Sequence, residues 1–192
     1  MNTPAHLIFG MTAFGRAGQR GLTMAAFAGA LVPDLSLYLL AGTHLLILGS
    51  APDIVFGQLY YSDTWQSVFR IDNSILLWGL ALVGAVMAPA PMAVAFCGAV
   101  LLHLGLDLPF HHDDGRAHFW PMTDWVFRSP VSYWDRDHHG LWVGGIEIAV
   151  ALACCAVLWR RSRAIGWRLV IVALALAEAL PGLAWALVFS GL

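Results

Sequence analysis

Runs of apolar residues cover most of this chain and limit what it can fold into. Five such runs lie at positions 22–48, 74–87, 91–108, 143–159 and 165–189. Of the 192 residues, 59% are apolar and 11% are charged, and the mean hydropathy is +0.72. These values lie outside the soluble globular range and predict a polytopic membrane protein. We therefore expect an all-α membrane helical bundle, with residues 1–192 forming one integral-membrane domain.

The first of the expected helices are short or kinked. Thr3 and Pro4 favour a helix start, with the threonine hydroxyl as the cap. Glycines at 15–21 end this helix after about a dozen residues, which is too short to span a bilayer alone. Pro33 interrupts the 22–48 run, because proline removes a backbone hydrogen bond and kinks the helix.

The middle of the chain predicts a surface loop followed by a helical hairpin. Residues 49–73 are rich in tyrosine, tryptophan and aspartate, a composition typical of a loop at the membrane surface. The runs at 74–87 and 91–108 are separated by two prolines, which favour a sharp turn between two antiparallel helices.

Imidazole and carboxylate groups are concentrated in residues 101–140, which hold six of the eight histidines. A metal site, a proton path or a folded polar cap on the bundle would each explain this concentration. The aromatic content of the 109–142 part is too high for a solvated linker. We expect this segment to form an ordered extramembrane cap.

Five residues are candidate metal ligands. His103 and Asp107 are four residues apart, so they share one helix face and can bind the same ion, although a local hydrogen bond at the helix end explains the spacing equally well. Asp34 follows Pro33 in an apolar run, where an unpaired carboxylate is costly, and is either a ligand or a partner of the kink. His6 is by default an interfacial residue. His111 continues the four-residue step beyond the expected helix end.

Other reactive residues have plainer explanations. Cys97, Cys154 and Cys155 lie in apolar runs without metal-binding spacing and are expected to be free, buried thiols. Glu147 fits a carboxylate favoured by a helix N-terminus, with a role near the metal as the alternative. Glu178, near the middle of the last run and three residues before Pro181, either accepts a hydrogen bond from a freed backbone amide or marks a buried polar contact.

The arginines predict the orientation in the membrane. The turn at 160–163 holds the densest cationic cluster, and the positive-inside rule places it in the cytoplasm. Counting the runs backwards puts Arg16 and Arg20 on the same side. The 109–142 segment and the C-terminus then lie on the outer face. No basic tract indicates a nucleic-acid partner.

Three short motifs resemble those of the membrane-bound metal-dependent hydrolases of the YdjM-like group. They are the PAHLIFG opening with His6, the VPDLS segment with Asp34, and His103-x-x-x-Asp107 late in an apolar helix. The resemblance implies a bacterial inner-membrane protein, so the outer face on which the arginines place the 109–142 loop is the periplasm. It also implies a metal site, with zinc as the expected ion, built from those four residues.

This chain also departs from the pattern of that group. Ser36 replaces the second aspartate, and residues 68–74 replace a histidine-bearing segment. If the missing residues are ligands in the group, this chain binds fewer ions, recruits His111, His112 or His118, or has lost catalysis.

Histidine and aspartate together suit Zn²⁺, with Mn²⁺ or Fe²⁺ as alternatives. An ion with an open position supports metal-assisted hydrolysis, and at the membrane interface a lipid or lipid-linked phosphate is the natural substrate. The chain would then have membrane lipids as its partners. The rival hypothesis is a non-catalytic membrane subunit whose 109–142 loop docks a protein partner or holds a structural metal. Haem ligation is a weaker alternative, because no paired-helix bis-histidine pattern is present.

Overall fold

The structure, a computed structural model, describes the backbone of residues 1–189 and the side chains of residues 1–181. Within these residues every named regular element is a helix. In chain order the helices are α1 (Thr3–Phe14), α2 (Arg20–Gly42), η1 (Thr43–Ile47), α3 (Pro52–Ile54), η2 (Val55–Leu59), α4 (Asp63–Asp72), α5 (Ile75–Met87), α6 (Pro91–Asp107), η3 (Arg136–His138), α7 (Gly140–Arg161) and α8 (Ile165–Phe189). The expected all-α class is confirmed.

Three described helical segments are long and apolar enough to cross a membrane: Arg20–Ile47, Asp63–Met87 and Gly140–Arg161. Helix α6 is apolar but shorter.

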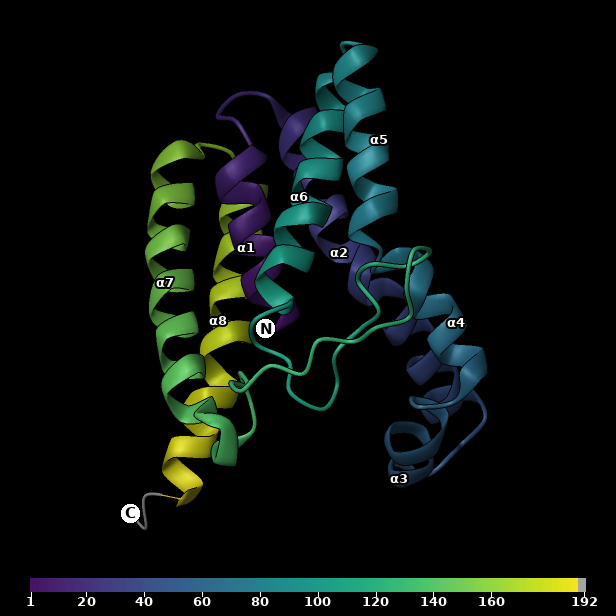
Figure 1. Ribbon diagram of the computed structural model, residues 1–192. Coiled ribbons are helices and arrows are strands. Elements are labelled where there is room, and N and C mark those ends of the chain that lie inside the picture. Colours follow the sequence, from purple (N-terminus) through teal and green to yellow (C-terminus); the bar gives the residue numbers. More distant parts are fainter. Residues whose placement is uncertain (190–192) are drawn as a thin grey trace.

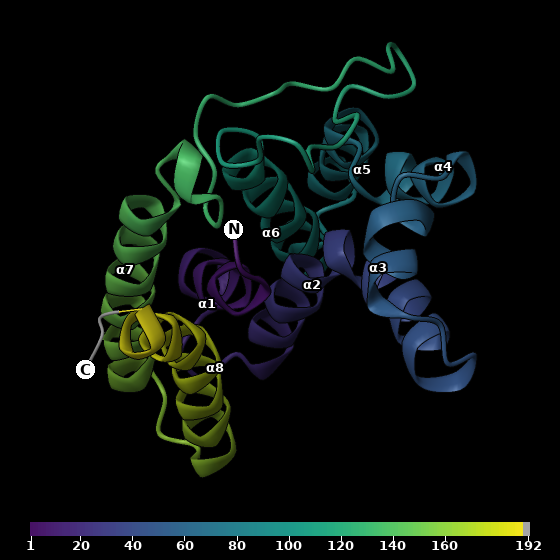
Figure 2. The same cartoon turned by 90° about the horizontal axis from the view of Figure 1, so that it is seen from below.

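The short helix α1 is the centre of the bundle. It packs against α2, α6, α7 and α8, and Figure 2 shows it enclosed by these four helices. Its Ala5, Ile8 and Met11 are buried in a core cluster shared with α7 and α8. In a membrane, close packing of these side chains holds the helices together, because the lipid is as apolar as the core. This packing fixes the position of His6, which lies on the same helix.

Small residues bring α1, α2 and α6 close together. Gly10 of α1 faces Ala30 of α2, and a Cβ at Gly10 would lie 2.7 Å from the Ala30 Cβ. At Gly29 of α2 a Cβ would collide with the backbone carbonyl of Phe96 in α6. Small residues allow this close helix approach in membrane proteins. The consequence is that the last turn of α6 lies beside the first turn of α1.

The interpretation of residues 49–73 as a surface loop is wrong, because most of this stretch is helical. Ser62 caps α4 by accepting a hydrogen bond from the amide of Trp65 at 3.4 Å. Trp65 and Phe69 then pack with Tyr60 and Val55 in a separate core cluster against the end of α2. Aromatic residues that suit a membrane surface therefore form a small core beside the main bundle (Figure 1).

The capping role expected for Thr3 is also wrong. Asn2 is the N-cap residue of α1 and makes no side-chain cap hydrogen bond, while the Thr3 hydroxyl donates to Asp34 of α2. Pro33 lies inside α2, which continues through it. The helix start predicted at Pro4 is confirmed, since Pro4 lies in the first turn of α1. The predicted turn at Pro89 and Pro91 is confirmed as well, since it joins α5 to α6.

The two ends of the bundle differ in their connections (Figure 1). The short turns at 15–19, 88–90 and 162–164 lie together at one end, and the long loop at 108–135 lies at the other. Backbone hydrogen bonds order this loop: the amide of Ser129 donates to His111 at 3.1 Å and that of Tyr133 to Phe110 at 3.1 Å. The ordered cap and the arrangement of the turns therefore agree with expectation.

Candidate metal centre

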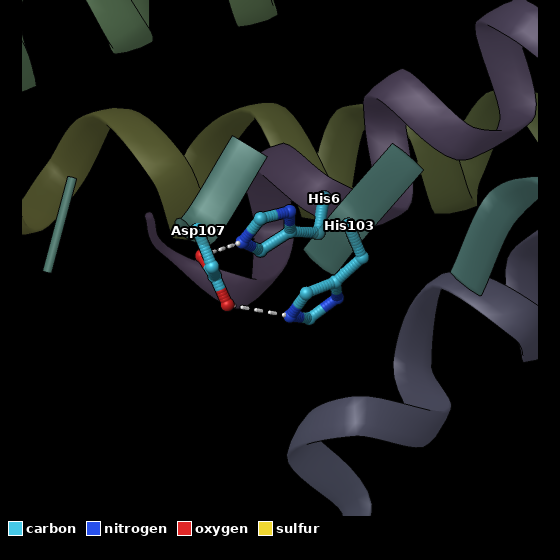
Figure 3. A group of neighbouring side chains, drawn as sticks. All are labelled: His6, His103 and Asp107. Carbon is cyan, nitrogen blue, oxygen red and sulfur yellow. Dashed lines mark hydrogen bonds and ion pairs between the residues drawn. The ribbon is translucent and has the colours of Figure 1, made fainter. Parts of the chain in front are cut away.

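Helices α1 and α6 bring two histidines and an aspartate together. His6 lies in the first turn of α1, and His103 and Asp107 lie in the last turns of α6. The two imidazole rings are stacked, with centroids 3.5 Å apart and planes 6° from parallel. Asp107 reaches toward both rings, as Figure 3 shows.

Each oxygen of the Asp107 carboxylate faces one of the histidines. His6 Nε2 lies 2.8 Å from Oδ1, and His103 Nε2 lies 3.0 Å from Oδ2 (Figure 3). The three residues are 1%, 1% and 7% exposed, in the order His6, His103, Asp107. One nitrogen or oxygen atom from each lies within 4.8 Å of the others, close enough for all three to bind one metal ion.

The hydrogen bond on the far side of His103 favours a cation in this cluster. His103 Nδ1 lies 2.7 Å from the backbone carbonyl of Ala30, which can only accept, so Nδ1 carries the proton. In the neutral ring Nε2 then carries no proton, and its lone pair faces Oδ2 of Asp107. Two lone pairs at this distance require a proton or a metal ion between them. Metal-binding histidines are commonly oriented by such a bond from the second ring nitrogen to a carbonyl.

Asp34 approaches the same cluster from α2. Its Oδ1 lies 3.7 Å from His103 Nε2, and its Oδ2 accepts a hydrogen bond from the hydroxyl of Thr3. The Thr3 hydroxyl in turn lies 2.7 Å from the hydroxyl of Tyr38. Asp34 is half-buried, and it lies at the edge of the cluster and not among the three closest groups.

His111 joins the cluster from the loop. Its Nε2 lies 3.2 Å from Asp107 Oδ1, and its Nδ1 lies 3.1 Å from Asp114 Oδ1. Burial alone would lower the pKa of His111, but hydrogen bonds to both aspartates outweigh it and raise this pKa. Burial alone would raise the pKa of Asp114, but the His111 contact outweighs it and lowers this pKa. The pair is thus stabilised in its charged form.

The structure brings all five predicted ligand candidates together: His6, Asp34, His103, Asp107 and His111. The other loop histidines have different partners, although His118 lines a cavity together with Asp107 and His111. His112 stacks on His138, with ring centroids 3.5 Å apart, and His118 Nδ1 lies 3.0 Å from the carbonyl of Asn73.

Three groups at the site were not singled out from the sequence. The amino group of Met1 lies 2.9 Å from Asp107 Oδ1, which attracts its positive charge, and 3.1 Å from His111 Nε2, which repels it when the ring is protonated. Asp114 and Thr3 are the other two. Asp114 is one of several loop aspartates, and Thr3 looks like a helix cap, so local sequence carries no signal for either role.

The glutamates and cysteines lie apart from the cluster. Glu147 Oε1 accepts a hydrogen bond from the backbone amide of Asn2 at 2.6 Å, so it binds the start of α1 and not the start of its own helix. Glu178 is 1% exposed in α8. Cys97, Cys154 and Cys155 are free thiols, as expected.

A cavity of about 430 Å³ opens next to the cluster. Asp34, Asp107 and His111 line it together with aromatic residues of the loop and of the α4 region, including Tyr60 and Tyr133. The Tyr133 ring packs against His111, with ring centroids 5.1 Å apart. Burial raises the pKa of Tyr60 to about 12 and also raises the pKa of Tyr133. Both hydroxyls therefore stay protonated near neutral pH.

Arg116 supplies a positive charge to the same cavity. Its guanidinium lies 4.5 Å from the centre of the Tyr60 ring and 4.1 Å from that of Phe69, positions that fix it by cation–π attraction. Its Nη1 is buried and has no hydrogen-bond partner among the described residues. An anionic group in the cavity would provide one.

Comparison with models of known protein families, with curated proteins and with solved structures finds no match for this chain. The geometry of the His–Asp cluster and of its cavity therefore carries the functional conclusion.

Proposed function

We propose that this protein is a membrane-embedded, metal-dependent hydrolase that acts on a lipid or lipid-linked phosphate at the membrane interface. We also propose that it is a divergent member of the membrane-bound metal-dependent hydrolases, located in a bacterial inner membrane with the 109–142 loop in the periplasm. The observation that carries the proposal is the position of His103 Nε2, which faces Asp107 Oδ2 at 3.0 Å beside the stacked ring of His6 while the Ala30 carbonyl holds the other ring nitrogen.

The donor set fits a borderline divalent ion. Two imidazole nitrogens and one carboxylate, supplied by His6, His103 and Asp107, suit Zn²⁺, and the same set can hold Mn²⁺ or Fe²⁺. Three protein ligands leave a further position open, as in catalytic zinc sites. A metal bound there would supply a water acidic enough to be deprotonated near neutral pH and would polarise a phosphoryl oxygen.

Residues around the cluster have roles of their own. Asp34 lies at the cavity edge with Oδ1 directed toward the cluster, and we assign it as the acceptor of the proton from the attacking water. The Thr3 hydroxyl holds the other oxygen of Asp34 and so fixes its orientation. His111 lies 3.2 Å from Asp107 and 3.1 Å from Asp114, so its ring can carry a proton from the cluster toward the loop.

The cavity suggests the substrate class. Arg116 offers a buried N–H with no partner among the described residues, and guanidinium groups pair strongly with phosphate oxygens. Aromatic walls suit the apolar part of a lipid, and aromatic residues are common at the level of the headgroups. Arg116 would hold the phosphate while the metal end of the cavity carries out its hydrolysis.

The second candidate function is the non-catalytic membrane subunit. Met122, Trp125 and Val126 in the loop are 82%, 54% and 43% exposed, and large apolar side chains in such positions favour a protein partner or a lipid surface. In this role the His–Asp cluster would hold a structural metal, and the loop would dock the partner.

A hydrolysis assay separates the two candidates. The purified full chain, loaded with zinc or manganese, is incubated with phosphatidate and with a polyprenyl diphosphate in mixed micelles, and released phosphate is measured.

Two variants test the assigned roles in this assay. The Asp34→Asn variant should lower kcat by about 10²–10⁴-fold. Arg116→Gln should lower kcat/KM by about 10- to 100-fold, the loss expected for one charge-assisted hydrogen bond. His139→Asn is the matched control, because His139 is exposed and has φ of 66°, which asparagine tolerates. Bound metal without turnover on either lipid would favour the subunit.

A further inference from the structure

A second cavity, of about 360 Å³, lies at the opposite end of the bundle from the His–Asp cluster. The turn at 15–19 between α1 and α2 forms one wall, and the turn at 162–164 between α7 and α8 forms the other. These turns lie at the same end of the bundle in Figure 1. The proposed hydrolase uses none of the residues that line this cavity.

Positive charge in this cavity is not compensated by the protein. Arg16, Arg20, Arg161 and Arg163 line it, and among the described residues no aspartate or glutamate does. Arg161 donates to the backbone carbonyl of Thr12 at 2.8 Å, which leaves its charge unpaired. The described part of the chain offers no ion pair to any of the four guanidinium groups. Such a cluster costs free energy by mutual repulsion unless an anion binds to it.

The floor of the cavity is apolar. Met11, Leu158 and Ile171 are buried there, and the half-buried ring of Trp167 forms part of the same lining. A site with a cationic rim above an apolar floor matches a molecule with an anionic head and a hydrocarbon body. Free phosphate would use the rim alone.

The level of the cavity along the bundle fits the lipid headgroups. Helix α7 is long and apolar enough to cross a membrane and ends at Arg161, so the rim arginines follow directly on an apolar span. Tryptophan and arginine both favour the membrane–water interface. Basic pockets between membrane helices are known to hold anionic lipid headgroups.

We propose that this cavity binds the phosphate headgroup of an anionic phospholipid from the adjacent leaflet. The guanidinium groups of Arg16 and Arg163, one from each turn, contact the phosphate from opposite walls, and an acyl chain lies against the apolar floor. A zwitterionic lipid binds more weakly, because its ammonium group is repelled by the same four arginines.

Lipid titration of the full chain tests this site. Dioleoyl-phosphatidylglycerol is titrated into detergent-solubilised protein, and the lipid retained per chain is measured by native mass spectrometry. Arg16→Gln and Arg163→Gln should each weaken retention by about tenfold or more, the loss expected for one charge-assisted hydrogen bond to phosphate. Arg160→Gln is the matched control, since Arg160 is exposed, belongs to the same turn region and does not line the cavity. It should retain the lipid as the wild type does.

Two further titrations make the result decisive. Dioleoyl-phosphatidylcholine should be retained at least several-fold less than phosphatidylglycerol, and inorganic phosphate should not displace the bound lipid at matched concentration. Equal losses for Arg160→Gln and Arg163→Gln would show attraction by general surface charge and overturn the site. Equal retention of the two lipids, or displacement by free phosphate, would overturn it as well.

Discussion

The two ends of the helical bundle treat charge in opposite ways. At the α6–loop end, Asp107 lies within 3.2 Å of the side chains of His6, His103 and His111, so acid and imidazole groups face each other in a buried cluster. At the other end, four arginines line a cavity that no acidic side chain among the described residues enters. The first arrangement has the donor atoms to hold a cation within the protein, whereas the second leaves positive charge without an acidic partner in the described part of the chain.

This difference follows from what each end buries. The His–Asp cluster forms where α1 and α6 bury ionisable groups, and an unpaired charge there costs several kcal/mol. The arginines are exposed and lie on short turns or at the helix ends beside them, where water can solvate their charge. Burial therefore selects compensated charge at one end, and exposure permits uncompensated charge at the other.

Cysteine labelling tests whether the two ends of the bundle lie on opposite faces of the membrane, and it has the largest expected effect. We expect a cysteine at Thr123, in the long loop, to react with a membrane-impermeant maleimide added to spheroplasts, because the proposed orientation places this loop in the periplasm. A cysteine at Ala164, in the arginine turn, should react only after lysis. Both positions are exposed, whereas Ser129 in the same loop is 1% exposed and unsuitable.

The chain with its three native cysteines is the control for background labelling. Reaction of both introduced cysteines from one side would place the two ends on the same face of the membrane. That outcome would contradict the assigned orientation and the separation of the two sites.

Asp107→Asn should cause the largest loss of stability at the cluster. Asp107 contacts three histidines and the Met1 amino group, and breaking buried ion pairs by removal of one partner costs about 3–5 kcal/mol. Chemical denaturation of the metal-free protein measures this change. Asp124→Asn, which removes a surface partner of Arg70 at 3.2 Å, should cost less than about 1 kcal/mol. Equal losses of unfolding free energy in the two variants would show that the buried cluster stabilises the protein no more than a surface ion pair does.

Gly29→Val should have an intermediate effect by separating α2 from α6. The new side chain meets the Phe96 backbone, and overpacking of this kind costs about 1–3 kcal/mol. It also moves the Ala30 carbonyl away from His103, which should weaken metal binding by about 10- to 100-fold. Ala28→Val, at an exposed neighbouring position, is the control. Unchanged metal affinity in Gly29→Val would mean that this hydrogen bond does not orient His103.

The smallest effect is expected in the loop, at Asp135. Its hydrogen bonds with His138 at 2.7 Å and with the amide of Asp137 at 3.0 Å lower the pKa of Asp135. A lowered folded-state pKa contributes stability above the unfolded value of about 3.9, and this contribution is lost as the pH falls through the folded value. The wild type should therefore melt at a higher temperature than Asp135→Asn at about pH 5. This difference should disappear as the pH falls below about 4. A constant difference across this range would exclude Asp135 as the titrating group.

Local sequence signals predicted helix α6 and the pairing of His103 with Asp107 on it. Proline at position 91 and the four-residue spacing of His103 and Asp107 depend only on neighbours along the chain, and α6 has the form that they predict. The packing of the short first helix beside α6 was expected from the requirement that the candidate ligands meet. Metal binding itself remains a prediction.

The remainder depends on contacts between distant segments, which local patterns do not encode. Residues 49–73 looked like a surface loop because their aromatics suit an interface, but Trp65 and Phe69 instead pack together under the end of α2. Thr3 caps no helix because Asp34, 31 residues away, competes for its hydroxyl. Arg116 and Asp114 reach the cavity through an irregular loop, whose path no periodicity predicts.

The metal content of the purified protein tests the central claim most directly. The full chain, carrying a C-terminal tag so that Met1 stays free, is purified without chelators, equilibrated with zinc and analysed for bound elements. We predict about one divalent ion per chain for the wild type and for His139→Asn, and none for His103→Ala, because removal of one of three ligands leaves too few donors. Circular dichroism verifies that each variant keeps its helices. A helical wild-type protein that holds no metal after this treatment would contradict the account.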